Sequence, residues 1–157
     1  SYALPGYPSA YEPCISVASI GPALKPTYYT NYNYGTDISA PGGSSLYSLY
    51  DDTPCTGEIL STVPTAFSTS GLSGYAMMQG TSMACPMVSG VAALGLSYAK
   101  KLGKRYSAKE FRSMLLSATN DISPYLTGEL AVSFTDGSSL ELYYPDFKGK
   151  LGTGYDV

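Results

Sequence analysis

The sequence predicts an α/β protein that forms a single domain. Three short strand-like runs bounded by proline and glycine come first, and two helix-like segments follow them. Hydrophobic residues make up 44% of the 157 residues and charged residues only 13%, which is typical of a globular chain and not of a disordered one. Because a chain of this length can bury about two thirds of its extended surface, we expect one packed domain over residues 1–157.

The predicted strands are short, and turn residues bound them. They cover residues 14–20, 35–40 and 58–63. Pro41-Gly42-Gly43 stops the second strand and Pro64 stops the third. Residues 44–57, which are polar and rich in tyrosine, are predicted to form a surface loop or an insertion.

Residues 82–101 are predicted to form a long helix. Its apolar positions are mostly small and nearly encircle the helix, so we expect it to be deeply buried and closely packed. Pro86 falls near the first turn, where a missing N–H costs least. Lys100 and Lys101 suit the C-terminal end of the helix dipole, and Gly103 suits its stop.

A second helix and a β-hairpin follow. The helix opens with a capping box formed by Ser107 and Glu110. The hairpin is expected near residues 129–144, where apolar residues alternate on both sides of Asp136-Gly137. A two-residue loop would mix the two faces, so we predict a three- or five-residue loop centred on Gly137, which pairs Phe134 with Leu140 and Val132 with Leu142.

Charge, histidine and cysteine content exclude several classes of function. A net charge of −3 argues against nucleic acid or anionic lipid as a partner, and no apolar run is expected to span a membrane. Since the chain has no histidine and no C-x-x-C spacing, we expect no metal site. Cys85 is predicted to be a small buried hydrophobe, while Cys14 and Cys55 either form a disulfide or remain two free, buried thiols.

The stretch most informative about function is Gly80-Thr81-Ser82-Met83-Ala84-Cys85-Pro86. It places a serine between a glycine turn and the start of the first helix. A helix N-terminus offers unpaired N–H groups and a partial positive charge, which suit a developing oxyanion. Ser82 is therefore a candidate nucleophile, although serines before helices are usually caps. Ala84 stands where an α/β-hydrolase has its second glycine, which disfavours that fold.

Together with Met87-Val88-Ser89-Gly90, this stretch resembles the nucleophile segment of the subtilisin-like serine proteases. Three further segments match the family in its order. Gly6-Tyr7-Pro8-Ser9-Ala10-Tyr11, running into Ile15-Ser16-Val17-Ala18, is similar to the turn and strand beside the primary specificity pocket. Asp37-Ile38-Ser39-Ala40-Pro41-Gly42 resembles the strand before the catalytic segment, and Lys150-Leu151-Gly152-Thr153-Gly154-Tyr155 resembles the glycine turn before the last helix.

This resemblance implies a doubly wound, mainly parallel sheet with helices on both faces, and a secreted endopeptidase that acts on polypeptides. It implies that Ser82 is the nucleophile, that the Ser82 N–H donates to the oxyanion and that Thr81 supports that site. Gly6 would border the pocket for the residue before the scissile bond, and Gln79 would contact bound peptide. A histidine would take the serine proton and an aspartate would orient that histidine. No cofactor is implied; calcium sites are common in the family, but no carboxylate cluster here matches one.

The chain also departs from the family. There the aspartate, the histidine and the asparagine that completes the oxyanion hole lie upstream of the turn matching Gly6, where this chain starts. We therefore expect the C-terminal half of a catalytic domain, inactive without its N-terminal half, with residues 129–144 and the segment around Cys55 as insertions. Three functions stay open: part of an active protease, a pseudoprotease retained for binding, or a tyrosine-rich binding domain in which Ser82 is only a helix cap.

Overall fold

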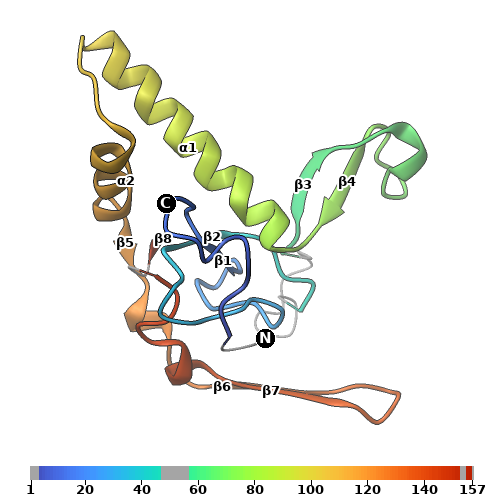
Figure 1. The fold of residues 1–157 in the computed structure, drawn as a ribbon. Coiled ribbons are helices and arrows are strands. Elements are labelled where there is room, and N and C mark those ends of the chain that lie inside the picture. Colours follow the sequence, from blue (N-terminus) through green and yellow to red (C-terminus); the bar gives the residue numbers. More distant parts are fainter. Residues whose placement is uncertain (1–3, 47–56, 153–154, 157) are drawn as a thin grey trace.

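The computed structural model describes residues 4–46, 57–152 and 155–156, and Figure 1 shows their arrangement. The two α-helices are α1 (Thr81–Lys101) and α2 (Ala108–Ser117). The strands are β1 (Val17–Ile20), β2 (Ile38–Pro41), β3 (Ile59–Thr62), β4 (Tyr75–Met78), β5 (Asn120–Asp121), β6 (Glu129–Ser133), β7 (Ser139–Tyr143) and β8 (Tyr155–Asp156). Short 3-10 turns are η2 (Thr65–Phe67), η3 (Ser123–Tyr125) and η4 (Tyr144–Phe147).

β1 and β2 form a parallel pair on which the candidate site stands. Their register runs from Val17 opposite Ile38 to Ile20 opposite Pro41. The other three pairs in the described part of the chain, β3–β4, β5–β8 and β6–β7, are antiparallel. The predicted first, second and third strands are thus present, whereas the doubly wound parallel sheet is not seen within the described residues and stays a prediction.

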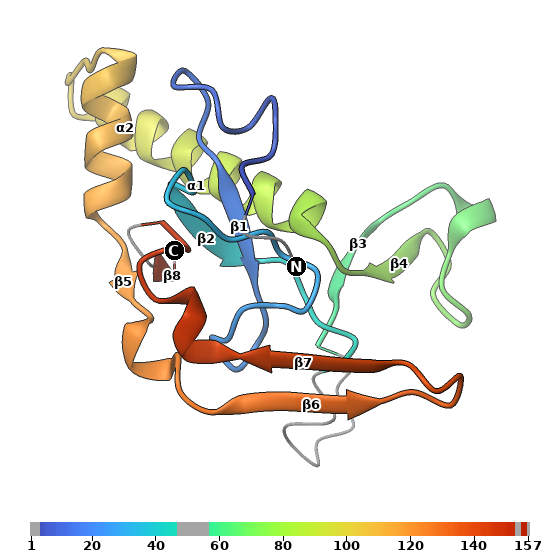
Figure 2. The same cartoon turned by 60° about the horizontal axis from the view of Figure 1, so that its bottom comes forward.

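The two faces of the β1–β2 pair carry separate hydrophobic clusters. On one face, Ile38 and Ala40 pack with Ala84 and Val88 of α1 and with Leu115 of α2. On the other, Ala18 and Ile20 pack with the C-terminal part of the chain, at Ile122, Leu126, Leu130, Leu142, Tyr144, Phe147 and Leu151. Both α-helices therefore cover one face of the pair, and the β6–β7 region covers the other (Figure 2). Within the described residues, α-helices are thus seen on one face, and not on both as was expected.

α1 begins one residue earlier than predicted and ends at the predicted residue. Gly103, with φ +69°, follows its C-cap as expected for a helix stop. Pro86 is the sixth residue of α1 and so lies in the second turn, not the first. There its missing N–H leaves the carbonyl of Ser82 without the usual helical partner.

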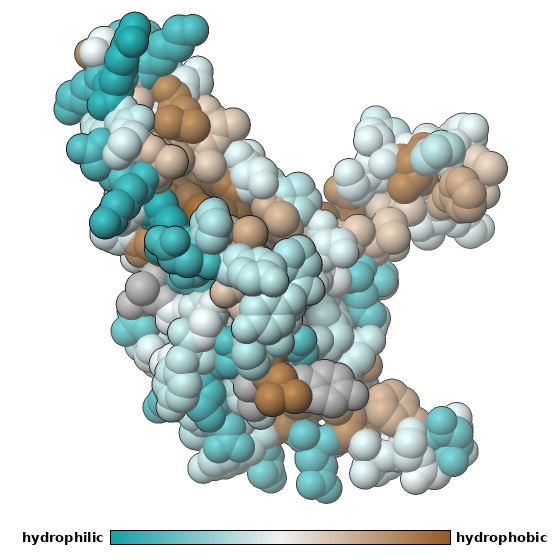
Figure 3. Space-filling model, viewed as in Figure 1, coloured by the Kyte–Doolittle hydropathy of each residue, from teal (hydrophilic) through white to brown (hydrophobic). Residues whose placement is uncertain are grey.

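α1 is much more exposed than predicted. Within it, Ala84, Val88 and Ala99 are buried, whereas Leu94 is 72% exposed and Tyr98 is 61% exposed. We call the exposed apolar positions that share one side of this helix the α1 stripe; they are Met87, Val91, Leu94, Tyr98 and Leu102. Apolar side chains are visible on the surface along α1 in Figure 3. The expectation of a deeply buried helix is therefore wrong for this chain.

By length and composition α1 is long and apolar enough to cross a membrane. This corrects the expectation that no apolar run reaches that length. The core helix of a soluble protein can meet the same criterion, and α1 packs its buried positions against β1 and β2.

α2 begins with the predicted capping box. Ser107 Oγ accepts from the N–H of Glu110 at 3.3 Å, and Glu110 Oε2 accepts from the N–H of Ser107 at 2.8 Å. The Ser107 hydroxyl also donates to Glu110 Oε2 at 2.7 Å, and this bond first, then that from the Ser107 N–H, lowers the pKa of Glu110. α2 is joined to the parallel pair by a hydrogen bond from Arg112 to the carboxylate of Asp37.

The hairpin β3–β4 projects away from the core (Figure 1). Its second strand, β4, was not predicted, although Tyr75-Ala76-Met77-Met78 is a short run rich in apolar residues that follows Gly74. β4 leads directly into the turn at Gly80, so this hairpin is connected to the start of α1.

The hairpin β6–β7 lies within the predicted residues, but its register differs by two. Val132 pairs with Leu140 and Leu130 with Leu142, so the loop is centred on Asp136 and not on Gly137. Asp136 Oδ1 accepts from the N–H of Ser138 at 2.9 Å, and Gly137, with φ +85°, takes the loop position after Asp136. A shift of two residues keeps each side chain on its face, which is why the alternation was still predictive.

The structure contradicts the prediction made for one cysteine, Cys85. Cys85 is free and exposed, so the expected small buried hydrophobe is wrong. Cys14 is free and half-buried, and Cys55 lies outside the described residues. The choice between a disulfide of Cys14 with Cys55 and two free thiols therefore stays a prediction.

Candidate active site

Ser82 lies in the first turn of α1 and is not its cap. The N-cap is Gly80, and no side chain caps the helix. Ser82 is exposed, and its hydroxyl has no hydrogen-bond partner among the described residues. The interpretation of Ser82 as only a helix cap is therefore wrong.

The backbone of the Gly80 turn leaves donors free at the N-terminus of α1. The N–H of Gly80 donates to the carbonyl of Gly42 at 2.9 Å, and the Gly80 carbonyl accepts from Met83 at 2.9 Å and from Ala84 at 3.3 Å. Within the described chain, the N–H of Ser82 has no backbone acceptor. This N–H, at the positive end of the helix dipole, is suited to bind an oxyanion.

Gly42 permits the close approach of the Gly80 turn to β1. A Cβ on Gly42 would lie 2.1 Å from Ser19 Oγ and 2.7 Å from the carbonyl oxygen of Gly80. Neither distance is compatible with a real side chain. The glycine after β2 is therefore required by the contact between the two segments, a role that its sequence context as a strand stop did not reveal.

Gln79 is held by two partners from its own chain. Its Nε2 donates to Tyr28 Oη at 3.0 Å, and its Oε1 accepts from the N–H of Ser45 at 2.7 Å. The side chain predicted to contact peptide thus also joins the residue before Gly80 to two distant segments.

Tyr29 reaches the same region and was not predicted from the sequence. Its Oη lies 2.8 Å from Ser19 Oγ, 2.9 Å from the Gly42 carbonyl oxygen and 2.6 Å from the Gly43 carbonyl oxygen. Burial raises the pKa of the Tyr29 phenol, although its hydrogen bonds oppose the shift. The phenol therefore remains protonated at neutral and mildly alkaline pH.

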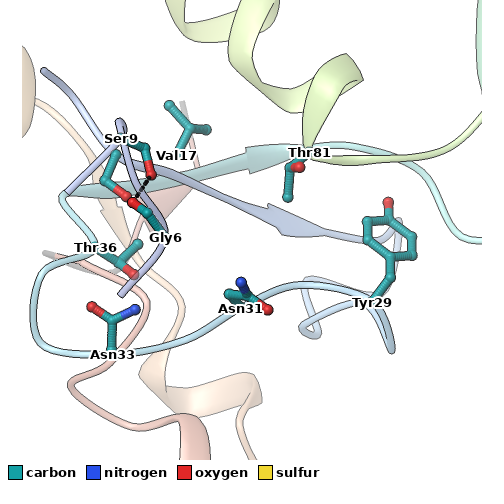
Figure 4. Close-up of a pocket in the computed structure, with 9 residues that line it drawn as sticks. Gly6, Ser9, Val17, Tyr29, Asn31, Asn33, Thr36 and Thr81 are labelled. Carbon is teal, nitrogen blue, oxygen red and sulfur yellow. Dashed lines mark hydrogen bonds between the residues drawn. The ribbon is translucent and has the colours of Figure 1, made fainter. Parts of the chain in front are cut away.

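A polar pocket of about 150 Å³ brings Gly6 and Thr81 together (Figure 4). It is also lined by Ser9, Ser16, Val17, Tyr29, Asn31, Asn33 and Thr36. The turn that carries Gly6 is closed by a hydrogen bond from Ser9 Oγ to the Gly6 carbonyl at 2.7 Å, and it contains a cis peptide bond between Tyr7 and Pro8. A Cβ on Gly6 would make only ordinary contacts, the nearest being Ser9 Oγ at 3.6 Å.

The four residues predicted for the site come from two regions of the sequence. Gln79 lies in the β4–α1 turn, Thr81 and Ser82 begin α1, and Gly6 shares the pocket with Thr81. The turn lies beside the carboxyl end of β2, to which Gly80 is hydrogen-bonded through Gly42. In the described part of the chain, no three histidine, cysteine, aspartate or glutamate residues gather as metal ligands.

The chain is similar in sequence to known proteins. Residues 3–139 match the model of the family described as "Subtilase family". The chain is 31% identical over 133 residues to an extracellular basic protease of Dichelobacter nodosus, covering 85% of this chain and 20% of that protein. It is 33% identical over 125 residues to the major intracellular serine protease of Bacillus subtilis, covering 78% of this chain and 33% of that protein.

A solved structure supports the fold as well. The crystal structure of a lanthipeptide protease superposes with a TM-score of 0.61 at 29% identity, covering 73% of this chain and 36% of that one. The 157-residue chain thus spans no more than about a third of the proteins compared here.

Proposed function

Because this chain belongs to the subtilase family of serine peptidases, we propose that it contributes the nucleophile, Ser82, to an endopeptidase. Ser82 Oγ attacks the carbonyl carbon of the scissile peptide bond, and a base takes the hydroxyl proton. The same proton then passes to the leaving amine as the C–N bond breaks, and water hydrolyses the resulting acyl-enzyme. The observation that carries this proposal is the exposed Ser82 hydroxyl beside its own unpaired N–H at the start of α1.

The oxyanion formed in this step is stabilised by the Ser82 N–H, and Thr81 supports that position. Both residues belong to the first turn of α1, where the helix dipole favours negative charge. Gly6 borders the pocket that receives the residue before the scissile bond, because it lies opposite Thr81 and leaves space where a side chain would stand. Gln79 lies next to the nucleophile turn and borders the bound peptide.

The base comes from outside the 157 residues, because these contain no histidine. We infer that the N-terminal half of the domain supplies the aspartate, the histidine and the asparagine of the oxyanion hole, and that this chain alone is inactive. The same half covers the α1 stripe, which is apolar and exposed in this structure. Secretion is proposed from the extracellular relative, although an intracellular protease of the family is also similar.

A pseudoprotease is the second candidate, with which the absence of histidine from these 157 residues is compatible. The two functions differ in what accompanies Ser82. An active enzyme requires an aspartate, a histidine and an asparagine in the full-length sequence, whereas a pseudoprotease lacks at least one of them. Peptide hydrolysis by the full-length protein separates the two directly.

The proposed function is tested with the full-length protein and two serine variants. Ser82→Ala is expected to abolish hydrolysis of a peptide amide substrate; in subtilisin, a member of this family, loss of the nucleophile lowers kcat about a millionfold. Ser89→Ala is the matched control, since its hydroxyl is also on α1 but donates to the carbonyl of Cys85 at 3.2 Å. Equal hydrolysis by wild type and Ser82→Ala would contradict the proposal.

A further inference from the structure

We propose that Tyr29 is a positioning residue for Ser82, a role that rests on the proposed function of Ser82 as nucleophile. Its phenol contacts three groups from two segments, the side chain of β1 residue Ser19 and the carbonyls of Gly42 and Gly43. The Gly42 carbonyl is also the acceptor for the N–H of Gly80. Tyr29 and the turn before the nucleophile therefore share one acceptor.

The hydrogens of this network can be assigned from chemistry. Carbonyl oxygens only accept, so the single phenol hydrogen of Tyr29 is donated to Gly42 or Gly43. The Ser19 hydroxyl then donates to Tyr29 Oη. Replacing the phenol by a phenyl ring removes the donor to these carbonyls and leaves the Ser19 hydroxyl without its acceptor.

The backbone that Tyr29 holds, directly at Gly42 and Gly43 and through the Gly42 carbonyl at Gly80, consists of glycines. Gly42, Gly43 and Gly80 have no side chains, and the last two have φ values of +82° and +151°. A restraint on this backbone has to come from hydrogen bonds or from packing by a neighbouring group. Tyr29 supplies hydrogen bonds to it at Gly42 and Gly43, and it lines the same pocket as Thr81 (Figure 4).

The preceding tyrosine is hydrogen-bonded to the residue before Gly80. Tyr28 Oη accepts from Gln79 Nε2, and the two tyrosine rings meet edge to face with centroids 5.2 Å apart. Tyr28 thus holds the residue before Gly80, and Tyr29 holds the loop to which Gly80 is bonded. Together they fix the turn that sets the position of the Ser82 N–H and of its Oγ.

A loosened turn affects the reaction more than substrate binding. Misplacement of a reacting group by about 1 Å can lower a rate about 100-fold, because attack requires a defined distance and angle. Tyr29 lines the same pocket as Gly6, but Tyr29→Phe keeps the ring and removes only the hydroxyl that contacts Ser19, Gly42 and Gly43, so binding of the substrate changes less. For Tyr29→Phe we expect kcat to fall about 10- to 100-fold while KM changes less than about threefold.

The test uses the full-length protein as wild type, Tyr29→Phe and Tyr34→Phe. Tyr34 is the matched control because it lies on the same segment and is 86% exposed. For each protein, kcat and KM are measured on a peptide amide, and the active fraction is titrated with a fluorophosphonate. Thermal unfolding is followed in parallel, because a purely structural role would lower the melting temperature and the active fraction but not kcat per active site.

A second variant covers the case in which Tyr29→Phe does not fold. Ser19→Ala keeps the phenol and removes only its hydrogen bond from β1, so a smaller fall in kcat is expected, with KM unchanged. If the wild type is active and either folded variant keeps the wild-type kcat per active site, this inference is wrong and the proposed function still stands. A wild type that neither hydrolyses peptide nor reacts at Ser82 overturns the proposed function and this inference together.

Discussion

The Arg112 guanidinium donates a hydrogen bond to the carboxylate of Asp37 and so joins α2 to the residue before β2. The other oxygen of the same carboxylate accepts from the N–H of Ser16 at 2.8 Å, just before β1. One side chain thus links both strands of the parallel pair to the second helix. These are the elements that bury the first turns of α1, at Ala84 and Val88.

Asp37→Ala is expected to destabilise the full-length protein by about 1–3 kcal/mol, because it leaves two donors without their acceptor. Arg112→Met should be milder, since its side chain keeps an apolar stem of similar length. Denaturant unfolding measures both, with Arg105→Met as the exposed control. If Asp37→Ala and wild type are equally stable, the Asp37 carboxylate does not stabilise the contact between α2 and the β1–β2 pair.

Gly42→Ala is expected to lower both stability and activity. The added Cβ meets Ser19 Oγ and the Gly80 carbonyl, so the nucleophile turn has to move. Overpacking of this kind destabilises by about 1–3 kcal/mol. Unfolding and kcat are compared with those of Gly90→Ala, where a Cβ on exposed α1 meets nothing within 4 Å. If kcat in Gly42→Ala matches wild type, the contact does not position Ser82.

Gly6→Val should change the choice of substrate more than the chemistry. Gly6 has no positive φ, so a side chain fits its backbone, and its Cβ would lie 3.6 Å from Ser9 Oγ and 4.0 Å from Asn31 Nδ2, two residues that line the pocket. Substrates with a large residue before the scissile bond are expected to lose about 10- to 100-fold in kcat/KM, and those with a small residue much less. A uniform effect on both substrates would place the specificity pocket elsewhere.

The 157-residue chain produced alone is expected to self-associate through the α1 stripe. Contiguous exposed apolar side chains of this kind are rare on stable monomers. Combining Leu94→Glu with Tyr98→Glu should shift the chain toward monomer in gel filtration, whereas Lys104→Glu should not. A wild-type chain that is monomeric and unfolds in one sharp cooperative transition would disprove this expectation.

Local patterns in the sequence predicted local structure well. The strands at Val17–Ile20, Ile38–Pro41 and Ile59–Thr62, the extent of α1 and the capping box at Ser107 all follow from short-range signals. The predicted hairpin register was wrong by two residues. The Asx-type hydrogen bond from the Ser138 N–H to Asp136 centres the loop on Asp136, and the spacing of apolar residues does not reveal this bond. The strand Tyr75–Met78 was missed because its run of four residues has no clear alternation.

Relations between distant segments could not be predicted in this way. The apolar pattern of α1 indicates which positions a complete domain would bury, but not which positions these 157 residues bury. Leu94 was therefore expected to be buried, whereas it is exposed. Gly80-Thr81-Ser82 was recognised because it is contiguous. Tyr29, Gly42 and Gly80 come from three segments and meet only in the folded chain.

The most direct test of the central claim is to locate the adduct formed when the full-length protein reacts with a fluorophosphonate. Attack by a serine oxygen forms the O–P bond and releases fluoride, so the modified peptide identifies the nucleophile. We predict one adduct, on Ser82, and none in Ser82→Ala. An adduct on another serine of an active protein, or equal labelling of Ser82→Ala, would contradict the account.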